Sequence, residues 1–317
     1  MTADTILVTG ATGFAGSHLL DALRGNPARI VAWRHAKASL STRTPGVLWQ
    51  QVDLLDRDAV RTAVRAIRPD FIYHCAGAAH VGHSWSASAA TLSVNVLGTH
   101  HLVDAVRLAR LQPRLVIPSS AMIYRPSSGP IREDHPIGPA SPYGLSKLAQ
   151  EMLGRHGLAG GAPAGLIARA FNHVGPRQDP SFAAAGFARQ IARIEAGLAP
   201  PVLMVGNLDA QRDLSDVRDT VRAYRMIMER GTPGVPYNVC SGRTRSIRVL
   251  LELLLAGTTA RITLQVDPAR YRPNDAPVLL GDNSRLRTEL GWSPQIPLET
   301  TAADLLRYWR SRVQEDR

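Results

Sequence analysis

A tyrosine and a lysine four positions apart are the residues of this chain best suited to proton transfer. They are Tyr143 and Lys147, in the run at residues 141–147, SPYGLSK. Pro142 suits the first turn of a helix, where its missing N–H costs no hydrogen bond. On such a helix Tyr143 and Lys147 share one face, and their side chains can converge. A nearby ammonium lowers the pKa of a phenol, so this pair predicts an acid catalyst.

Lysine is rare in this chain. Of the 37 lysines and arginines, only Lys37 and Lys147 are lysines. In a chain whose cationic side chains are nearly all arginine, a lysine is expected where a compact ammonium is required. The alternative is a surface Tyr143 beside a solvated Lys147 on an amphipathic helix, because the Tyr-x-x-x-Lys pattern is short.

A glycine-rich turn opens the chain. Residues 10–16, GATGFAG, follow a β-type run at 5–9 and precede helical periodicity at 17–23. Glycines in this context permit a tight turn, a close approach to a pyrophosphate and close helix–strand packing. The helix N-terminus then faces the phosphates. We predict a dinucleotide site rather than an ordinary glycine-rich βα turn, with contacts from Gly10, Thr12, Gly13, Phe14, Ala15 and Gly16.

The end of the second strand indicates which dinucleotide binds. That strand, residues 29–33, should end beside the adenosine ribose, where an NAD site usually has an acidic residue. This chain has Arg34 and His35 there. Arginine favours a 2′-phosphate, so we predict NADP(H), and a solvent-facing Arg34 is the alternative. The other predicted cofactor contacts are Asp53, Leu54, Ala76, Ala78, Tyr143 and Lys147.

A serine ends a later strand on the same expected edge. Strands and helices alternate along the first half, which predicts a doubly wound parallel sheet with right-handed crossovers. Ligands bind beyond the carboxyl ends of such strands, where Ser120 follows the strand at 114–118. A serine there is often only a turn residue. With Tyr143 and Lys147 on the same edge, we predict that Ser120 donates a hydrogen bond to a carbonyl.

Composition limits the classes of function. With 317 residues, 44% hydrophobic and 20% charged, the chain is expected to form a soluble two-lobed protein with no membrane span or signal peptide. Cys75 and Cys240 lie in apolar runs and read as free thiols in a reducing, cytoplasmic compartment, with no metal site. The net charge of +11 is compatible with nucleic-acid binding. However, the arginines are scattered and aromatic residues make up only 5%, so anionic small molecules are the expected partners.

These motifs together resemble the extended short-chain dehydrogenase/reductases, the NAD-dependent epimerase/dehydratase family that acts on nucleotide sugars. The resemblance covers nearly the whole chain and rests on the glycine turn, Ser120, Tyr143, Lys147 and Asn95. The chain is most similar to the GDP-mannose 4,6-dehydratase and GDP-4-keto-6-deoxymannose reductase branch, at residues 80–85, 172–178, 205–213, 271–275 and 281–283. The resemblance implies an α/β architecture: a Rossmann domain at 1–171 with a return segment at about 214–240, and a nucleotide-sugar lobe at 172–213 and 241–317.

One departure from this branch bears on the reaction. Its dehydratases carry a glutamate two residues after the catalytic serine or threonine, which moves the protons that dehydration requires. Here that position is Met122, and a thioether cannot move protons. We therefore predict a reductase that uses NADPH to convert GDP-4-dehydro-6-deoxy-D-mannose to GDP-6-deoxy-D-mannose (GDP-rhamnose).

The resemblance also implies roles for single residues. Tyr143 supplies the proton, Lys147 lowers its pKa and holds the nicotinamide ribose, and Ser120 is the second donor to the developing alkoxide. Asn172 and Arg212 would contact the diphosphate, and Arg177 would help cover the closed site. The remaining predicted substrate contacts are Arg272 and Asp275 for the nucleoside, with Ser84 and Met122. Any single arginine is alternatively a surface residue.

Other functions remain open at this point. One alternative is a related nucleotide-sugar enzyme: a dehydratase with another base, an epimerase, or a reductase giving the talose-type product. A different class is an NADP-binding sensor or scaffold without turnover, against which the intact Tyr143 and Lys147 argue. In this family the helices at about 88–110 and 142–156 would form a four-helix dimer interface. The alternative is that their apolar residues pack inward.

Overall fold

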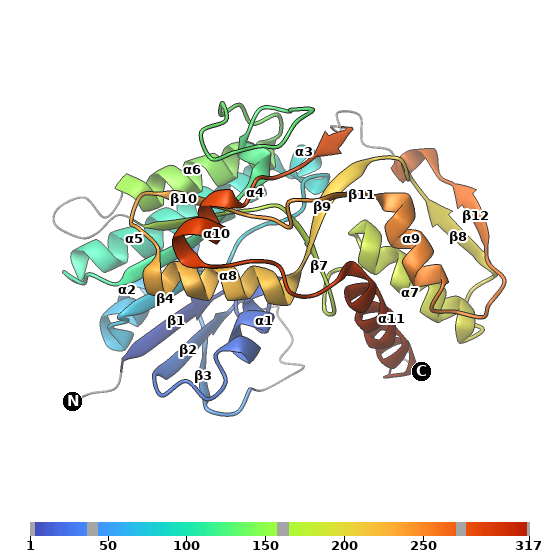
Figure 1. Ribbon diagram of the computed structural model, residues 1–317. Coiled ribbons are helices and arrows are strands. Elements are labelled where there is room, and N and C mark those ends of the chain that lie inside the picture. The colour runs from blue at the N-terminus through green and yellow to red at the C-terminus, as the bar shows by residue number, and fades with distance from the viewer. Residues whose placement is uncertain (1–3, 37–43, 157–164, 271–276, 316–317) are drawn as a thin grey trace.

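The computed structural model describes residues 4–36, 44–156, 165–270 and 277–315. A seven-stranded parallel sheet with helices on both faces forms the first lobe, and a smaller lobe lies beside it (Figure 1). Its strand order is β10-β6-β5-β4-β1-β2-β3, so the order reverses at the neighbours β1 and β4. The strands are β1 (Thr5–Thr9), β2 (Arg29–Arg34), β3 (Val47–Gln51), β4 (Phe71–His74), β5 (Arg114–Ser120), β6 (Leu166–Ala170) and β10 (Pro236–Val239). This confirms the predicted doubly wound sheet, whose ligand crevice lies at such a reversal.

Two apolar cores cover the two faces of this sheet. Ile6 and Val8 belong to the core that includes α1 (Phe14–Ala22) and α8 (Val217–Arg230). Leu7 belongs to the opposite core, with α2 (Arg57–Ile67) and α5 (Gly98–Leu108), as the alternation of strand side chains requires. The helix α6 (Pro142–His156) packs beside α5 and against β5. Among the described residues, no helix is both long and apolar enough to span a bilayer.

The helix expected at 88–110 is not continuous. It consists of α4 (Ser88–Leu92), a π-helical turn η1 (Ser93–Leu97) and α5. The π turn carries Asn95, which is fully buried. Such turns are often found at functional sites. Apolar spacing alone does not reveal the extra residue in a π turn, so the sequence predicted a single helix.

The second lobe has its own core. The helices α7 (Ala183–Glu195), α9 (Ile247–Leu255) and α11 (Leu298–Glu315) pack together with a two-stranded sheet. That sheet pairs β8 (Val202–Val205) with β12 (Thr263–Val266) in parallel. A second small sheet is built on β9 (Gln211–Asp216), which pairs with β7 (Asn172–Val174), β11 (Thr244–Ser246) and β13 (Val278–Leu279).

One C-terminal segment lies on the other side of the expected domain boundary. The helix α10 (Ser284–Leu290) packs against α8 and β10, and Trp292 is buried in the same core as α1. The Trp292 indole donates to the carbonyl of Asp219, whose carboxylate accepts the backbone N–H groups of Gln295 and Ile296. The assignment of all of 241–317 to the second lobe is therefore corrected here. A short helix pattern does not indicate which lobe the helix packs against.

Candidate active site

Ser120 and Tyr143 meet at the carboxyl edge of the sheet. Ser120 is the last residue of β5, and its hydroxyl caps a short 3-10 turn by accepting the N–H of Met122 at 3.2 Å. Tyr143 lies in the first turn of α6, whose start is capped by Ser141, which accepts the N–H of Gly144 at 3.0 Å. The Ser120 side chain lies near the Tyr143 phenol and lowers its pKa. The structure thus joins the two groups predicted to contact a substrate carbonyl.

A glycine lets the two elements approach this closely. A Cβ at Gly144 would overlap the carbonyl oxygen of Met122 and lie 3.0 Å from Pro139. Real Cβ atoms do not approach a carbonyl oxygen so closely, so any other residue would push α6 away from the end of β5. Gly144 therefore sets the spacing between Tyr143 and Ser120.

The electrostatics of the pair differ from the expectation. Burial raises the pKa of Tyr143, and the side chain of Ser120 lowers it only in part. The Lys147 ammonium donates to Oε1 of Gln150. Burial lowers the pKa of Lys147 to about 8, although Cys75 and Glu151 act in the opposite direction. The net shift of the Tyr143 pKa is therefore upward, because loss of hydration disfavours the phenolate, and the lowering effect of Lys147 stays a prediction.

The glycine turn has the shape that a dinucleotide requires. Gly10 has φ +62°, and a Cβ there would lie 2.5 Å from the backbone of Ala76. A Cβ at Gly16 would overlap the carbonyl group of Gly10. Gly13, by contrast, is exposed and precedes the first residue of α1. The turn is closed where helix and strand pack and open at the N-terminus of α1, which fits a bound pyrophosphate.

The other predicted cofactor residues line the same edge. Arg34 is the half-buried last residue of β2, and its carbonyl accepts the N–H of Val52 at 3.1 Å. Asp53 follows β3, is exposed, and accepts the N–H of Leu55 at 2.9 Å. Its neighbour Leu54 is half-buried. The two alanines lie just after β4: Ala76 donates its N–H to Thr9 at 3.2 Å, and Ala78 exchanges two hydrogen bonds with Asn95, at 2.7 and 3.1 Å.

Ser84 has a structural role that the sequence did not predict. It lies in α3 (His83–Ser86), is fully buried, and donates to the carbonyl of Val81 at 2.7 Å. Its hydroxyl also accepts the N–H of Tyr143 at 3.2 Å. These two hydrogen bonds make Ser84 an anchor for the start of α6. Its expected contact with the substrate stays a prediction.

The other predicted substrate residues are spread over the second lobe and the loop after β5. Met122 is half-buried beside Ser120, and Asn172 is exposed at the start of β7. Arg212 is buried on β9 and donates to the carbonyl of Gln211 at 2.7 Å. Arg272 and Asp275 lie outside the described residues.

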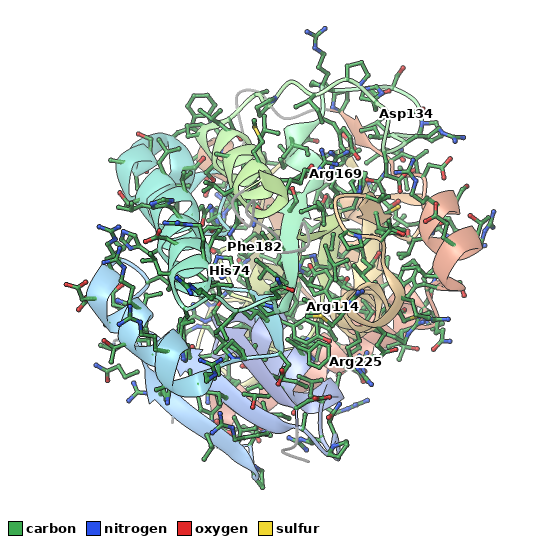
Figure 2. All side chains as sticks on the ribbon, turned by 90° about the vertical axis from the view of Figure 1, so that its left-hand side faces the viewer. His74, Arg114, Asp134, Arg169, Phe182 and Arg225 are labelled. Atoms are coloured by element: carbon green, nitrogen blue, oxygen red, sulfur yellow. The ribbon has the colours of Figure 1, made fainter. Side chains whose placement is uncertain are left out.

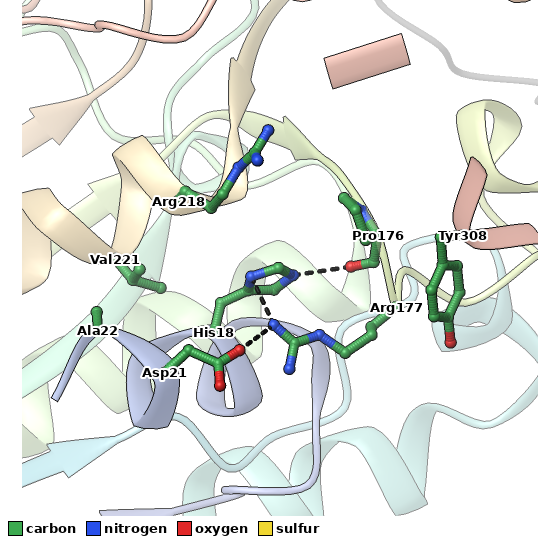
Figure 3. A pocket seen from close by; sticks show the side chains of 8 residues that line it. All are labelled: His18, Asp21, Ala22, Pro176, Arg177, Arg218, Val221 and Tyr308. Carbon is green, nitrogen blue, oxygen red and sulfur yellow. Dashed lines mark hydrogen bonds and ion pairs between the residues drawn. The ribbon is translucent and has the colours of Figure 1, made fainter. Parts of the chain in front are cut away.

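Arg177 lies in a cavity away from the catalytic pair (Figure 3). Its guanidinium donates to Asp21 at 2.6 Å and to Nδ1 of His18 at 2.7 Å, both on α1. His18 in turn donates Nε2–H to the carbonyl of Pro176 at 2.8 Å, and burial lowers its pKa to about 4. Arg177 thus ties the segment after β7 to α1, because a carboxylate and a neutral imidazole are its partners there. The expectation that it helps cover the closed site stays a prediction.

The cavity itself does not form the catalytic site. It has a volume of about 580 Å³, and its other arginine, Arg218, is paired with Asp216 and Asp304. Of the described residues, those lining it do not include Ser120 or Tyr143. With both arginines neutralised by carboxylates, the cavity has no free cation to hold a diphosphate. Its lining residues are His18, Asp21, Ala22, Pro176, Arg177, Arg218, Val221 and Tyr308.

Comparison with known proteins agrees with this geometry. A family model described as GDP-mannose 4,6 dehydratase matches residues 7–305. The GDP-6-deoxy-D-mannose reductase of Pseudomonas aeruginosa is 35% identical, over 98% of this chain and 99% of that protein. The GDP-mannose 4,6-dehydratase of Vibrio cholerae is 26% identical, over 95% of this chain and 92% of that protein.

Solved structures give the same result. RMD from Pseudomonas aeruginosa, complexed with NADPH, has a TM-score of 0.84 and 33% identity, covering 98% of this chain and 100% of that one. UDP-glucose 4-epimerase from Thermotoga maritima, with UDP-glucose, has a TM-score of 0.88 and 25% identity, covering 98% and 99%. The chain therefore belongs to the GDP-mannose 4,6-dehydratase family of extended short-chain dehydrogenases/reductases.

Proposed function

We propose that this protein reduces the 4-keto group of GDP-4-dehydro-6-deoxy-D-mannose with NADPH, giving GDP-6-deoxy-D-mannose (GDP-rhamnose). The observation that carries the proposal is Met122 beside the neighbouring side chains of Ser120 and Tyr143. This set can donate a proton to a ketone, but at position 122 it lacks the acid/base that dehydration requires. The similarity to the reductase of Pseudomonas aeruginosa supports the same choice.

The chain's own residues supply the acid in this proposal. A buried phenol with a raised pKa stays protonated at neutral pH, which is the form needed to protonate a developing alkoxide. Ser120 would be the second hydrogen-bond donor to that oxygen. Lys147, with a pKa near 8, remains largely charged at neutral pH and would stabilise the phenolate left after proton transfer.

The cofactor residues fit NADPH, which supplies the hydride when bound. The open backbone at Gly13 and the N-terminus of α1 would hold the pyrophosphate. Arg34, at the end of β2, would hold the 2′-phosphate. For the substrate, Asn172 and Arg212 are proposed to bind the diphosphate, and Arg272 and Asp275 the nucleoside.

Replacing Arg34 by glutamine is expected to weaken NADPH binding roughly 10- to 100-fold, the range for losing a hydrogen bond to a charged group. NADH, which has no 2′-phosphate, should lose little affinity. Fluorescence titration of each reduced cofactor measures both effects. Arg24→Gln, which removes an exposed arginine just beyond α1, is the matched control. Equal losses for the two cofactors would contradict the role of Arg34.

The activity itself is tested with purified protein, NADPH and the keto sugar. Loss of NADPH absorbance with formation of the rhamno product, identified by NMR of the sugar, is the expected result. A talose-type product would change the proposed stereochemistry. Formation of keto sugar from GDP-mannose and NADP⁺ would instead indicate a dehydratase. Binding of NADPH without turnover of any GDP, UDP, CDP or dTDP keto sugar would favour the sensor or scaffold.

We also propose that two chains associate through α5 and α6 as a four-helix bundle. The helices α5 and α6 lie side by side (Figure 1). Four large apolar side chains are exposed on them and on η1, namely Leu97, Leu108, Leu145 and Met152. Clustered exposed apolar residues are typical of an interface. Light scattering should give about twice the chain mass of 34.3 kDa. Leu145→Glu with Met152→Glu should give the monomer mass, and an unchanged mass would exclude this face.

A cytoplasmic location is part of the same proposal. Both cysteines, Cys75 and Cys240, are free thiols. Free thiols persist in a reducing compartment. NADPH and nucleotide sugars are the small-molecule partners that the proposed reaction uses, and neither a nucleic acid nor a membrane is among them.

A further inference from the structure

A line of buried hydrogen bonds connects the first strand of the sheet with Lys147. Thr9 of β1 lies 2.8 Å from Nδ1 of His74 on β4, and Nε2 of His74 lies 2.9 Å from the hydroxyl of Thr99 on α5. Nε2 of Gln150 on α6 is 2.9 Å from the same hydroxyl, and Oε1 of Gln150 accepts from the Lys147 ammonium. All five side chains are buried, and Figure 2 shows His74 within the first lobe.

The direction of these hydrogen bonds is fixed at Thr99. Its hydroxyl oxygen is 2.6 Å from the backbone carbonyl of Asn95, which can only accept, so the hydroxyl proton lies on that bond. The Thr99 oxygen therefore accepts from its other two neighbours. Gln150 must turn its NH₂ group toward Thr99, and its carbonyl oxygen necessarily faces Lys147.

The same reasoning fixes the tautomer of His74. The Thr9 hydroxyl accepts the N–H of Ala76 at 3.2 Å and donates its proton to Nδ1 of His74. Nε2 of His74 therefore carries the ring proton and donates it to Thr99. Burial lowers the pKa of His74 to about 3, with Lys147 adding to the effect, so the imidazole is neutral. A flip of Gln150 would turn its NH₂ group toward the Lys147 ammonium and its carbonyl oxygen toward the Thr99 oxygen, so it is unfavourable.

The ammonium is bonded to a neutral group in this structure. The Glu151 carboxylate, one residue beyond Gln150, is occupied by Arg169, with N···O distances of 2.7 and 3.1 Å. Burial raises the pKa of the Cys75 thiol to about 12, so the thiol is neutral as well. The titratable or charged groups near Lys147 are His74 at the end of β4 and Cys75 just after it, Tyr143 and Glu151 on α6, and Arg169 on β6.

We propose that Gln150 is a positioning residue for the Lys147 ammonium, and that Thr99 and His74 fix the orientation in which Gln150 acts. The amide carbonyl stabilises the ammonium without neutralising it. A carboxylate at this position would form an ion pair that competes with other partners of Lys147. The consequence for catalysis rests on the proposed function, whereas the effect on Lys147 itself does not.

The composition of the chain allows a direct test on Lys147. Only two lysines are present, so a Lys37→Arg protein with ¹³C-labelled lysine gives a single lysine side-chain signal. An NMR titration of that signal reports the Lys147 pKa without substrate or cofactor. Gln150→Met, which keeps the side-chain length but removes the acceptor, should lower the Lys147 pKa. Gln150→Glu should raise it by roughly 1–3 units, as a nearby opposite charge does.

Variants at Thr99 test the anchor of Gln150. Thr99→Ser keeps the hydroxyl and should leave the Lys147 pKa as in the parent. Thr99→Val removes the acceptor for the Gln150 amide and should lower the Lys147 pKa in the same direction as Gln150→Met. General loosening of the fold cannot produce opposite shifts in Gln150→Met and Gln150→Glu. If Gln150→Met does not fold, the comparison of Gln150→Glu with the two Thr99 variants still decides the question.

Kinetics complete the experiment. The alkaline limit of kcat/KM should move with the Lys147 pKa from variant to variant, downward for Gln150→Met and upward for Gln150→Glu. The proposal is overturned if the Lys147 pKa is the same in the parent and both Gln150 variants. If the pKa shifts as expected but the parent reduces no keto sugar, the positioning role stands and the proposed function fails.

Discussion

Replacing Tyr143 by phenylalanine is expected to lower kcat for keto-sugar reduction by roughly 10²-fold or more, the range for loss of a general acid. The change removes one hydroxyl, which lies near Ser120 at the carboxyl edge of the sheet. The affinity for NADPH should change little, because Gly13 and Arg34 are proposed to hold the phosphates. The absorbance of NADPH under saturating cofactor measures kcat, and a fluorescence titration measures cofactor affinity.

A second buried tyrosine provides the control. The Tyr237 hydroxyl donates to Glu289 at 2.9 Å and accepts the N–H of Thr232 at 3.2 Å, within the first lobe and apart from Ser120. Tyr237→Phe loses a comparable buried hydroxyl and should retain turnover. If Tyr143→Phe also keeps turnover within a few-fold of the parent, Tyr143 is not the acid. The proton would then have to come from another group, such as the neighbouring hydroxyl of Ser120.

The largest loss of stability is expected from Arg169→Met. Arg169 donates to both oxygens of Glu151, at 2.7 and 3.1 Å, to the hydroxyl of Tyr124 at 2.8 Å and to the carbonyl of Glu133 at 2.9 Å. The side chains of Arg169 and Glu151 are 4% and 2% exposed, so removing the cation leaves a buried carboxylate that keeps the longer ion pair with Arg155, at 3.7 Å. Breaking such a pair lowers the free energy of unfolding by about 3–5 kcal/mol. Urea unfolding followed by circular dichroism measures the loss.

Two further variants separate charge from packing. Arg307→Met removes an exposed arginine paired with Asp304 on α11, and surface changes of this kind shift stability by only about 0.5 kcal/mol. Arg169→Met combined with Glu151→Leu removes both charges and should recover much of the lost stability, since apolar replacements of buried pairs are often neutral. A double variant as unstable as Arg169→Met would show that packing and the contacts to Tyr124 and Glu133 dominate.

The features that the sequence predicted correctly depend on local patterns. Strand alternation and helical spacing predicted the parallel sheet, and the glycine spacing predicted the tight turn at Gly10. Because parallel strands end at one edge, Ser120 and Tyr143 were expected to lie together, and the structure places them close enough for Ser120 to affect the pKa of the phenol. These inferences need only neighbouring residues and the rule for strand order.

The features that the sequence did not predict depend on tertiary contacts between distant segments. Ser84 and Arg177 were assigned to the substrate, and the contacts that their polar atoms make, with Tyr143 in one case and α1 in the other, were not predicted. Burial raises the pKa of Tyr143, and the burial of a side chain cannot be predicted from the spacing of a motif. Gln150 was also missed, although its position in the sequence carried a signal. It lies three residues after Lys147, at helical spacing, and that position alone marks it as a neighbour of the ammonium.

The return of α10 and Trp292 to the first lobe has a consequence for the order in which the protein is made. Residues 284–292 and the strand β10 complete the core that also contains α1 and α8. During synthesis the first 171 residues leave the ribosome long before these segments exist. Until then the sheet lacks its edge strand β10, and the face that α8 and residues 284–292 cover stays exposed. The nucleotide-binding lobe therefore completes its folding only when nearly the entire chain has emerged. A chaperone that binds exposed apolar surface is expected to act on the chain during that interval.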